Sequence, residues 1–189
     1  IGGVLLPFLA QEGRPLRTMI ISPPQAGKTT LLRDLIRSFS NGEGLSAPAK
    51  VGLVYERGEV AGCYQGVPQL DVGIRTDVLT GCPKREGVFL LLRSMGPQLI
   101  ATDELGRPGD LDLIEEILNT GVGFITTAHA WDIKDLTRRP SLQHLWVQGL
   151  VERVVVLSRR LGPGTLEGVW DGRTHEPLLA QVQRLEVTR

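Results

Sequence analysis

Cysteine, lysine and aromatic residues are scarce in this sequence. There are only two cysteines, Cys63 and Cys82, and they are not closely spaced. This argues against a disulfide framework or a zinc site, so we expect two free thiols. Aromatic residues make up 5% of the chain. We recognise no signal peptide and no apolar run long enough to cross a bilayer, so we expect no transmembrane segment.

The charges of the chain balance. Lys and Arg together number 21, as do Asp and Glu. This balance argues against a large sequence-independent surface for nucleic acid or anionic lipid, and we expect no nucleic-acid partner. A length of 189 residues, with 41% apolar and 22% charged residues, is typical of one α/β domain with a sizeable core. The chain opens on IGGVLLPFLAQEGRP, and we expect residues 1–189 to be a single core domain cut from a longer protein.

Strand-like and helix-like segments alternate along the chain. The segments that have the composition of buried strands are 17–22, 50–55, 98–103, 122–129 and 152–160. The segments expected to be helical are 29–39, 85–95, 109–121 and short pieces within 132–148. In the helix at 109–121 we expect Asp110 to be the N-cap. Residues 56–84 are rich in glycine and turn formers, which favours mostly loop or hairpin.

This alternation predicts a mostly parallel sheet with crossover helices, followed by hairpin strands from residue 164 onward. Ligands of such sheets bind beyond the carboxyl ends of the strands. Glu56, Asp103 and His129 all fall at such ends, as does the loop after residue 22. We therefore expect these four polar features to gather at one edge of the sheet.

The stretch ISPPQAGKTT resembles a phosphate-binding loop between a strand and a helix. Gly27, Lys28 and Thr29 fit the usual pattern, but its first position is Ser22 instead of glycine. In such a loop the backbone N–H groups hold phosphate oxygens, the lysine reaches the β- and γ-phosphates, and the threonine hydroxyl binds Mg²⁺. A polar loop at a helix N-terminus without a ligand is the alternative. The expected ATP-binding residues are Ser22, Pro23, Pro24, Gln25, Ala26, Gly27, Lys28, Thr29 and Thr30.

An acidic pair follows the strand-like run QLIAT. Asp103 can hold the Mg²⁺ shell together with Thr29, and Glu104 can orient or deprotonate water. A strand ending in Asp-Glu is a weak signal alone, and a solvated acidic turn is the alternative. Downstream of a phosphate loop the signal is strong. ATP and Mg²⁺ are therefore the expected cofactors.

Four stretches of the chain resemble the stage III sporulation protein AA family. They are ISPPQAGKTTLLRDLIR, YERGEVAGCYQGVPQLDVGIRTDVLTGCPK, LLRSMGPQLIATDELGRP and VERVVVLSRRLGPGTLE. The resemblance implies a secretion-type ATPase, related to the motors of type II and type IV secretion, with a three-layer α/β/α P-loop NTPase fold of the RecA/AAA-like kind. The family usually carries an N-terminal region before the ATPase core, and we expect residues 1–189 not to include it.

The resemblance also implies roles for two further residues. Glu56 in YERGE matches an acidic box that positions water or a metal-bound water, although a strand-end salt bridge with Arg57 is an alternative. His129 in TTAHA matches a histidine box that senses the γ-phosphate, although a lone histidine is as often a satisfied core residue. In this chain Tyr55 stands where the family often has aspartate.

Arginines from a neighbouring subunit often stabilise charge on a transferred phosphoryl group. Arg57, Arg75, Arg93 and Arg107 are the candidates, and most exposed arginines are simply solvated. Arg93 and Arg107 resemble arginines that flank the acidic strand in secretion ATPases. The expected catalytic residues are Glu104, Glu56, His129, Arg93 and Arg107.

The leading hypothesis is an ATP-hydrolysing motor subunit. By resemblance it forms a ring, usually a hexamer, with membrane-embedded channel proteins as partners. It is expected in the cytoplasm on the mother-cell side of the forespore membrane. The alternatives are a nucleic-acid-dependent ATPase like the related plastid and cyanobacterial family, a small-molecule kinase, and a non-hydrolysing nucleotide switch. The small number of aromatic residues argues against the first alternative, and the absence of an arginine-rich lid argues against the second.

Overall fold

The computed structural model describes residues 2–45, 47–56, 59–107, 109–180 and 182–185. Its strands are β1 (Ala10–Gln11), β2 (Arg14–Pro15), β3 (Thr18–Ser22), β4 (Val51–Tyr55), β5 (Thr76–Thr80), β6 (Leu99–Leu105), β7 (Gly123–His129), β8 (Arg153–Ser158), β9 (Thr165–Asp171), β10 (Pro177–Leu179) and β11 (Gln183–Arg184). Its helices are η1 (Gly2–Val4), α1 (Leu6–Leu9), α2 (Lys28–Asn41), α3 (Lys84–Ser94), α4 (Asp110–Asn119), α5 (Ile133–Leu136) and α6 (Pro140–Val147).

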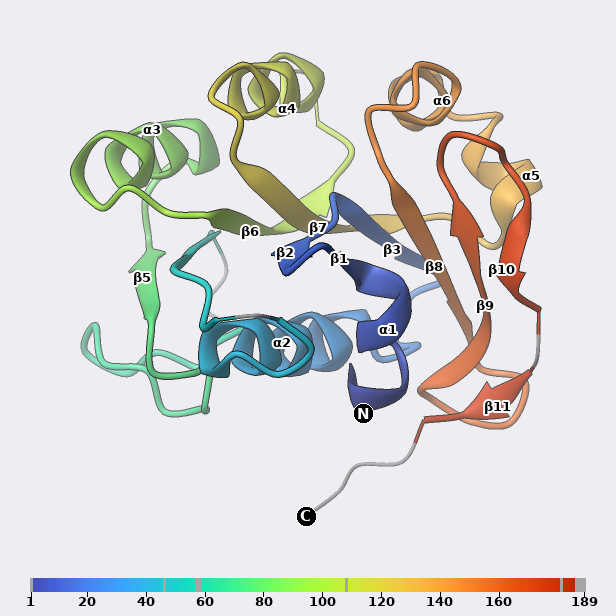
Figure 1. Cartoon of the computed structure of the whole chain (residues 1–189), viewed down its shortest axis with the longest axis horizontal. Helices are drawn as coiled ribbons and strands as arrows, with labels where there is room; N and C mark the ends of the chain where they lie inside the picture. The colour runs from blue at the N-terminus through green and yellow to red at the C-terminus, as the bar shows by residue number, and fades with distance from the viewer. Residues whose placement is uncertain (1, 46, 57–58, 108, 181, 186–189) are drawn as a thin grey trace.

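One large sheet organises the molecule, with strand order β10-β9-β8-β3-β7-β6-β4-β5 (Figure 1). All neighbouring pairs from β8 to β5 are parallel. Strands β9, β10 and β11 add antiparallel pairs at the end of the chain. The prediction of a mostly parallel sheet with C-terminal hairpin strands is confirmed.

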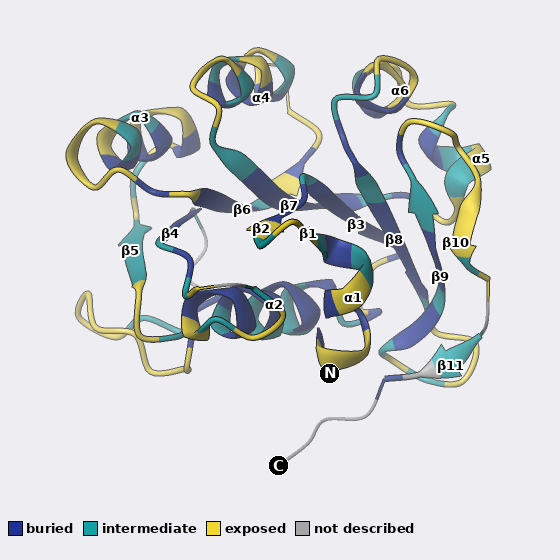
Figure 2. Ribbon diagram, viewed as in Figure 1, coloured by how far each residue is buried: buried dark blue, intermediate teal, exposed yellow. Residues whose placement is uncertain are grey.

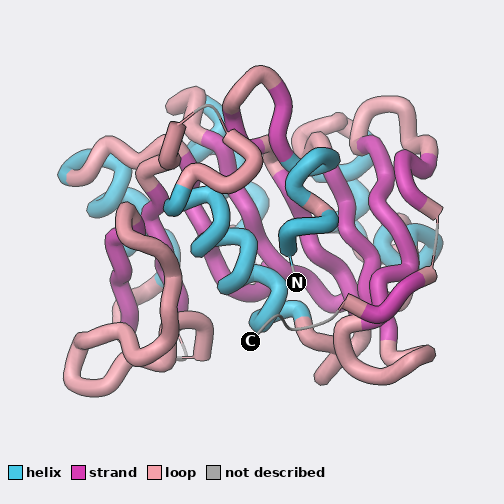
Figure 3. The backbone as a smooth tube through the Cα atoms, turned by 60° about the horizontal axis from the view of Figure 1, so that its bottom comes forward, coloured by secondary structure: helices cyan, strands magenta, loops and turns pink. Residues whose placement is uncertain are grey.

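Helices cover both faces of the sheet and make three layers. Helices α1 and α2 lie on one face, and α3, α4, α5 and α6 lie on the other (Figure 1). Figure 3 shows the N-terminal helical turns beside α2 on the same side of the sheet. None of the helices in the described ranges is long and apolar enough to cross a membrane.

The central strands are buried on both faces (Figure 2). In β3 every residue is buried, and alternate side chains enter different cores because successive side chains of a strand point to opposite faces. Ile20 packs in the core against α2, whereas Met19 and Ile21 pack in the core beneath α4 and α6. This two-sided burial explains why the strand reads as one apolar run.

Residues 56–84 are mostly loop, as predicted, but they also contain β5, which the sequence analysis missed and which pairs in parallel with β4 at the edge of the sheet. Its sequence TDVLT is partly buried and places its two apolar residues side by side, so it shows no alternating pattern. One local prediction was wrong. Asp110 is not the N-cap of α4; Gly109 takes that position, and Asp110 is the first helical residue. The prediction that both cysteines are free is confirmed.

Candidate functional site

The loop between β3 and α2 has the geometry of an anion cradle. Gly27 is the N-cap of α2 with φ of +93°, and no side chain caps that helix, so its first N–H groups can face a ligand. A Cβ on Gly27 would lie 3.3 Å from the backbone nitrogen of Gly164. That same nitrogen donates to the carbonyl of Ala26 at 2.9 Å. The loop is therefore braced by the turn between β8 and β9, and glycine is required at its last position.

Lys28 is buried at the first position of α2, with 8% of the residue exposed. Its ammonium donates to the Ser22 carbonyl at 3.3 Å, the Ser22 hydroxyl at 3.2 Å and the Pro23 carbonyl at 3.3 Å. It also lies 3.1 Å from Nδ1 of His129. Burial lowers the pKa of Lys28, and the nearby Glu104 carboxylate opposes this shift.

His129 joins the phosphate-loop lysine to the acidic pair. It ends β7 beside Ser22, the last residue of β3. A lysine ammonium can only donate, so Nδ1 of His129 accepts and the proton of the neutral ring sits on Nε2. Nε2 lies 3.2 Å from Oε2 of Glu104 and contacts that carboxylate. Lys28, His129 and Glu104 thus form one continuous chain of contacts.

A bulge near the end of β6 places both carboxylates of the acidic pair at one cavity. Ala101 pairs with Ile125 and Glu104 with Thr127, so three steps along β6 match two along β7. A regular strand would send Asp103 and Glu104 to opposite faces. The register shift brings both into the lining of one cavity, and bulges re-aim side chains in this way.

That cavity has a volume of about 240 Å³ and lies between the phosphate loop and the ends of β4 and β6. Its lining includes Thr29, Tyr55, Glu56, Glu59, Val60, Lys84, Asp103, Glu104, Leu105, Gly106 and Arg107. Within the described residues, no three His, Cys, Asp or Glu side chains form a metal cluster. Thr29 and Asp103 fit Mg²⁺, which takes few protein ligands and keeps waters and phosphate oxygens.

Glu56 and Arg107 close the outer side of this cavity. The backbone N–H of Glu56 donates to Oδ2 of Asp103 at 3.2 Å, and the Glu56 side chain pairs with Arg107. Burial raises the pKa of Asp103, and the Lys84 ammonium partly offsets that rise. Burial also opposes ionisation of Glu56, but the bonds from Arg107 and from the backbone of Lys84 outweigh it and lower the pKa of Glu56.

Lys84 is a site residue that the sequence analysis missed. It is the first residue of α3 and only 5% exposed. Its ammonium donates to the carbonyl of Glu104 and, at 3.4 Å, to Oδ1 of Asp110. One signal was available in the sequence. Lys84 directly precedes the helix predicted at 85–95, and a crossover helix begins near the carboxyl edge of the sheet.

The remaining predicted site residues take different places. Thr30 lies in the first turn of α2, partly buried. Arg93 is exposed in the last turn of α3 and stacks on Phe89, and the helix rise puts it about 13 Å along α3 from Lys84. Arg93 is therefore not brought to the site of its own chain, and Arg75 does not line the cavity either. Arg57 lies outside the described residues.

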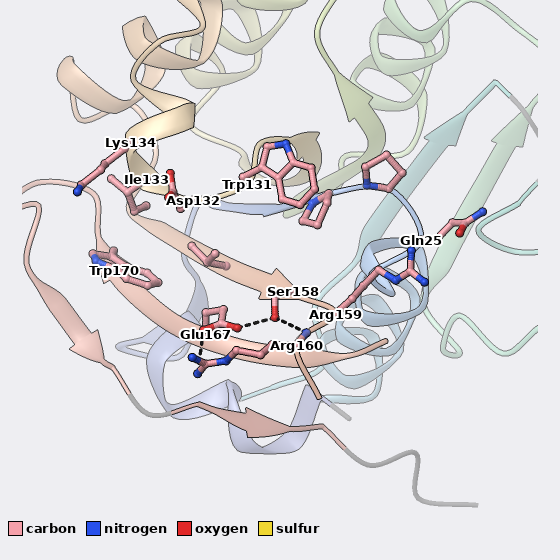
Figure 4. Close-up of a pocket in the computed structure, with 13 residues that line it drawn as sticks. Gln25, Trp131, Asp132, Ile133, Lys134, Ser158, Arg159, Arg160, Glu167 and Trp170 are labelled. Atoms are coloured by element: carbon pink, nitrogen blue, oxygen red, sulfur yellow. Dashed lines mark hydrogen bonds and ion pairs between the residues drawn. The ribbon is translucent and has the colours of Figure 1, made fainter. Parts of the chain in front are cut away.

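A second, larger hollow lies on the other side of the phosphate loop. It measures about 1220 Å³, and its lining includes Pro23, Pro24, Gln25, Trp131, Asp132, Ile133, Lys134, Val156, Ser158, Arg159, Arg160, Glu167 and Trp170. Figure 4 shows the two tryptophans around it, with Ser158, Glu167 and Arg160 joined by hydrogen bonds and an ion pair. Neither carboxylate of the acidic pair is in its lining.

Comparisons with solved structures identify the fold. The VirB11 ATPase from the Brucella suis type IV secretion system, solved with sulphate, superposes with a TM-score of 0.61 at 18% identity. It aligns with 92% of this chain and 51% of its own length. The Legionella pneumophila ATPase DotB gives a TM-score of 0.55 at 20% identity, over 82% of this chain and 43% of its own. The three-layer P-loop ATPase fold expected from the sequence is confirmed.

Comparisons of sequence identify the family. Stage III sporulation protein AA of Bacillus subtilis (strain 168) is 50% identical over 167 residues. The match covers 88% of this chain and 54% of that protein, so the chain spans about half the length of its relative. The model of the family "Sporulation stage III, protein AA" matches residues 2–176. The chain therefore belongs to the stage III sporulation protein AA family.

Proposed function

We propose that this chain is the ATP-binding and ATP-hydrolysing core of a motor subunit in a secretion-like complex. One observation carries the proposal: the bulge in β6 gives Asp103 and Glu104 a common cavity with Thr29. The contacts of His129 then join Glu104 to Lys28. A strand-end acidic pair on the metal side of a phosphate loop is the arrangement that phosphoryl transfer to water requires.

Each residue has a role in this proposal. The backbone N–H groups of residues 25–29 hold the phosphates, and Lys28 moves from its loop acceptors to the β- and γ-phosphates. Thr29 and Asp103 hold Mg²⁺, which neutralises phosphate charge when it is bound. Glu104 accepts a proton from the attacking water. His129 holds Glu104 in place and responds to the γ-phosphate.

Glu56 and Arg107 have a different role, at the mouth of the cavity. Arg107 is more than half exposed, and its only ion pair among the described residues is with Glu56. An exposed arginine beside a phosphate site can reach the nucleotide of a neighbouring subunit. Arg93, exposed at the far end of α3, is a second candidate for that role. Both assignments require assembly into an oligomer, for which the proposal is a hexameric ring.

The biological setting follows from the family. A sporulation protein with a secretion-ATPase fold fits a motor at a channel between mother cell and forespore, acting from the mother-cell cytoplasm through membrane-embedded partners. The chain spans about half of its Bacillus relative. A longer protein, extended to the full length of that relative, is therefore the proper subject for activity and assembly measurements, and ATP turnover should rise with its concentration.

A non-hydrolysing nucleotide switch is the main alternative, and Glu104 separates the two. Glu104→Gln should keep nucleotide affinity and lower turnover by about 10² to 10⁴, the usual contribution of a general base. Asp103→Asn should instead weaken Mg²⁺-dependent binding. Turnover of the longer protein is measured by phosphate release, and affinity by calorimetry with a slowly hydrolysed ATP analogue. Turnover unaffected by Glu104→Gln would transfer the role to Glu56.

A further inference from the structure

We propose that Lys84 is a positioning residue that fixes the bulged end of β6, so that Asp103 and Glu104 are presented together to a metal-bound nucleotide. The inference rests on the proposed nucleotide-binding function and adds a residue to it. The ammonium of Lys84 contacts three different parts of the site at once. Those parts are the β6 backbone, the Asp103 carboxylate and the start of α4.

The first contact fixes the backbone of the bulge. The Lys84 ammonium donates to the carbonyl of Glu104, the residue at which the β6–β7 register resumes. One residue earlier, the carbonyl of Asp103 accepts from the hydroxyl of Thr126 at 3.0 Å and from that of Thr102 at 3.0 Å. Side chains therefore hold two successive carbonyls of the irregular segment. Lys84 supplies the only charged donor among these side chains.

The second contact acts on the predicted metal ligand itself. Nζ of Lys84 lies 3.8 Å from Oδ1 of Asp103, which is an ion pair but too long for a hydrogen bond. The other oxygen, Oδ2, accepts the backbone N–H of Glu56. The Asp103 carboxylate is thus oriented from both sides. Because Oδ1 makes no hydrogen bond to Lys84, a metal ion can bind this oxygen without breaking one.

The third contact ties in the turn that leads to α4. Oδ1 of Asp110 accepts from Lys84 at 3.4 Å, and Oδ2 accepts the backbone N–H groups of Gly106 and Arg107 at 2.8 Å each. The ammonium of Lys84 therefore has two hydrogen-bond acceptors, the Glu104 carbonyl and Asp110, and an ion-pair partner in Asp103. Lys84 therefore acts through its neighbours and is not itself a free ligand for phosphate.

The charge balance of the cavity points the same way. Four carboxylates line it, from Glu56, Glu59, Asp103 and Glu104, against the two cations Lys84 and Arg107. Arg107 is 57% exposed and paired with Glu56, whereas the Lys84 side chain is 6% exposed. The buried cation beside Asp103 is therefore Lys84, and its loss removes the ion pairs that the described residues provide for Asp103 and Asp110.

The test measures nucleotide binding, not turnover. A fluorescent ADP analogue is titrated into the chain without Mg²⁺ and then at increasing Mg²⁺ concentrations. Lys84→Met should raise the Mg²⁺ concentration at half-effect by about 10- to 100-fold, the usual cost of removing a residue that supports a metal ligand, and should lower the Mg²⁺-free affinity much less. Lys84→Arg, which keeps the charge and the donors, should restore most of the Mg²⁺ response.

Two controls separate positioning from general stability. Lys50→Met removes a lysine at the amino end of β4, where its ammonium is 4.0 Å from Asp77, and should leave the Mg²⁺ response at the parent value. The double variant Lys84→Met with Asp110→Asn also removes the Asp110 charge, which Lys84→Met alone would leave without its ion pair. If Lys84 serves only as a counter-ion for Asp110, this double variant recovers the Mg²⁺ response and the inference is overturned. We expect no recovery, because Asp103 and the Glu104 carbonyl still lack their partner.

The outcomes distinguish the inference from the proposed function. If Lys84→Met does not fold by circular dichroism, Lys84→Gln replaces it, since the amide keeps a donor and loses the charge; it too should need more Mg²⁺. A parent chain without Mg²⁺-dependent binding refutes the proposed function and the inference with it. A parent that responds to Mg²⁺, with position-84 variants that respond equally, refutes the inference alone.

Discussion

Nε2 of His129 lies 3.2 Å from Oε2 of Glu104, so the last residue of β7 holds the side chain proposed as the base. The other ring nitrogen accepts from Lys28 at 3.1 Å. The imidazole therefore contacts the residue expected to bind phosphate and the residue expected to activate water. If Lys28 moves when nucleotide binds, the imidazole of His129 can transmit that movement to Glu104.

His129→Ala should lower turnover more than affinity. The substitution removes the ring that contacts Glu104, while Lys28 keeps its three acceptors in the loop. An interaction with a charged group contributes at most about 1.5 to 3 kcal/mol, so turnover should fall by up to roughly 100-fold. Phosphate release and analogue titration on the longer protein measure both quantities. Equal losses in both would mean that His129 acts on binding instead.

Lys28 and Ser22 should behave differently when replaced. Lys28→Ala should abolish tight ATP binding, because a charge-assisted contact to the phosphates is lost. Ser22→Gly should keep affinity within a few fold, because Lys28 retains the carbonyls of residues 22 and 23. Calorimetry with a slowly hydrolysed analogue decides both. Parent-like affinity in Lys28→Ala would remove the phosphate-loop assignment.

Thr126→Val should weaken the bulge. The buried hydroxyl of Thr126 donates to the Asp103 carbonyl, and valine has nearly the same shape without the donor. Thr102 still donates to that carbonyl, so the cost should be at the low end of the range for a lost buried partner, about 1 kcal/mol. Urea unfolding measures it. Thr137→Val, which removes a hydroxyl whose hydrogen bond is exposed at the C-cap of α5, is the matched control and should change stability much less.

Glu152 should make stability depend on acid. It is 4% exposed, and burial raises its pKa, but Arg14, the Arg17 backbone N–H and the Arg17 charge outweigh burial and lower the pKa from 4.5 to about 2. A carboxylate with a lowered folded-state pKa stabilises the fold above its unfolded value, and this contribution disappears as pH falls from about 4.5 to 2. The contribution at pH 7 is about 3 kcal/mol.

Urea unfolding at neutral pH and near pH 3 tests this contribution. Glu152→Gln should be less stable than the parent at neutral pH and should lose less stability on acidification. If the parent and the variant lose the same stability on acidification, folding does not lower the pKa of Glu152. That result would contradict the prediction. Arg173, 3.4 Å from the same carboxylate, provides a milder variant because its side chain is 67% exposed.

Arg107→Ala should cut turnover of the assembled longer protein more than its affinity for ATP. If the arginine acts on a neighbour's nucleotide, mixing this variant with Glu104→Gln should restore part of the activity. The same mixing tests Arg93, which lies at the far end of α3, away from the cavity of its own chain. Turnover that is independent of protein concentration, from a monomeric longer protein, would contradict the ring and favour a switch.

The sequence by itself determined the features that are contiguous along the chain. The phosphate loop lies within a few consecutive residues, and the buried strands are apolar because both of their faces are covered. The alternation of strands and helices then required a parallel sheet, which placed Glu56, Asp103 and His129 at one edge. These expectations needed no knowledge of which strands pair.

Only the tertiary structure decided the features that depend on register and on distant partners. Strict alternation would separate Asp103 and Glu104, and the bulge that unites them exists only in the pairing of β6 with β7. Strand β5 forms because β4 offers a free edge, and its own sequence lacks an apolar pattern. Lys84 reads as an ordinary lysine until α3 brings it against β6, where burial, two hydrogen bonds and an ion pair with Asp103 give it a role.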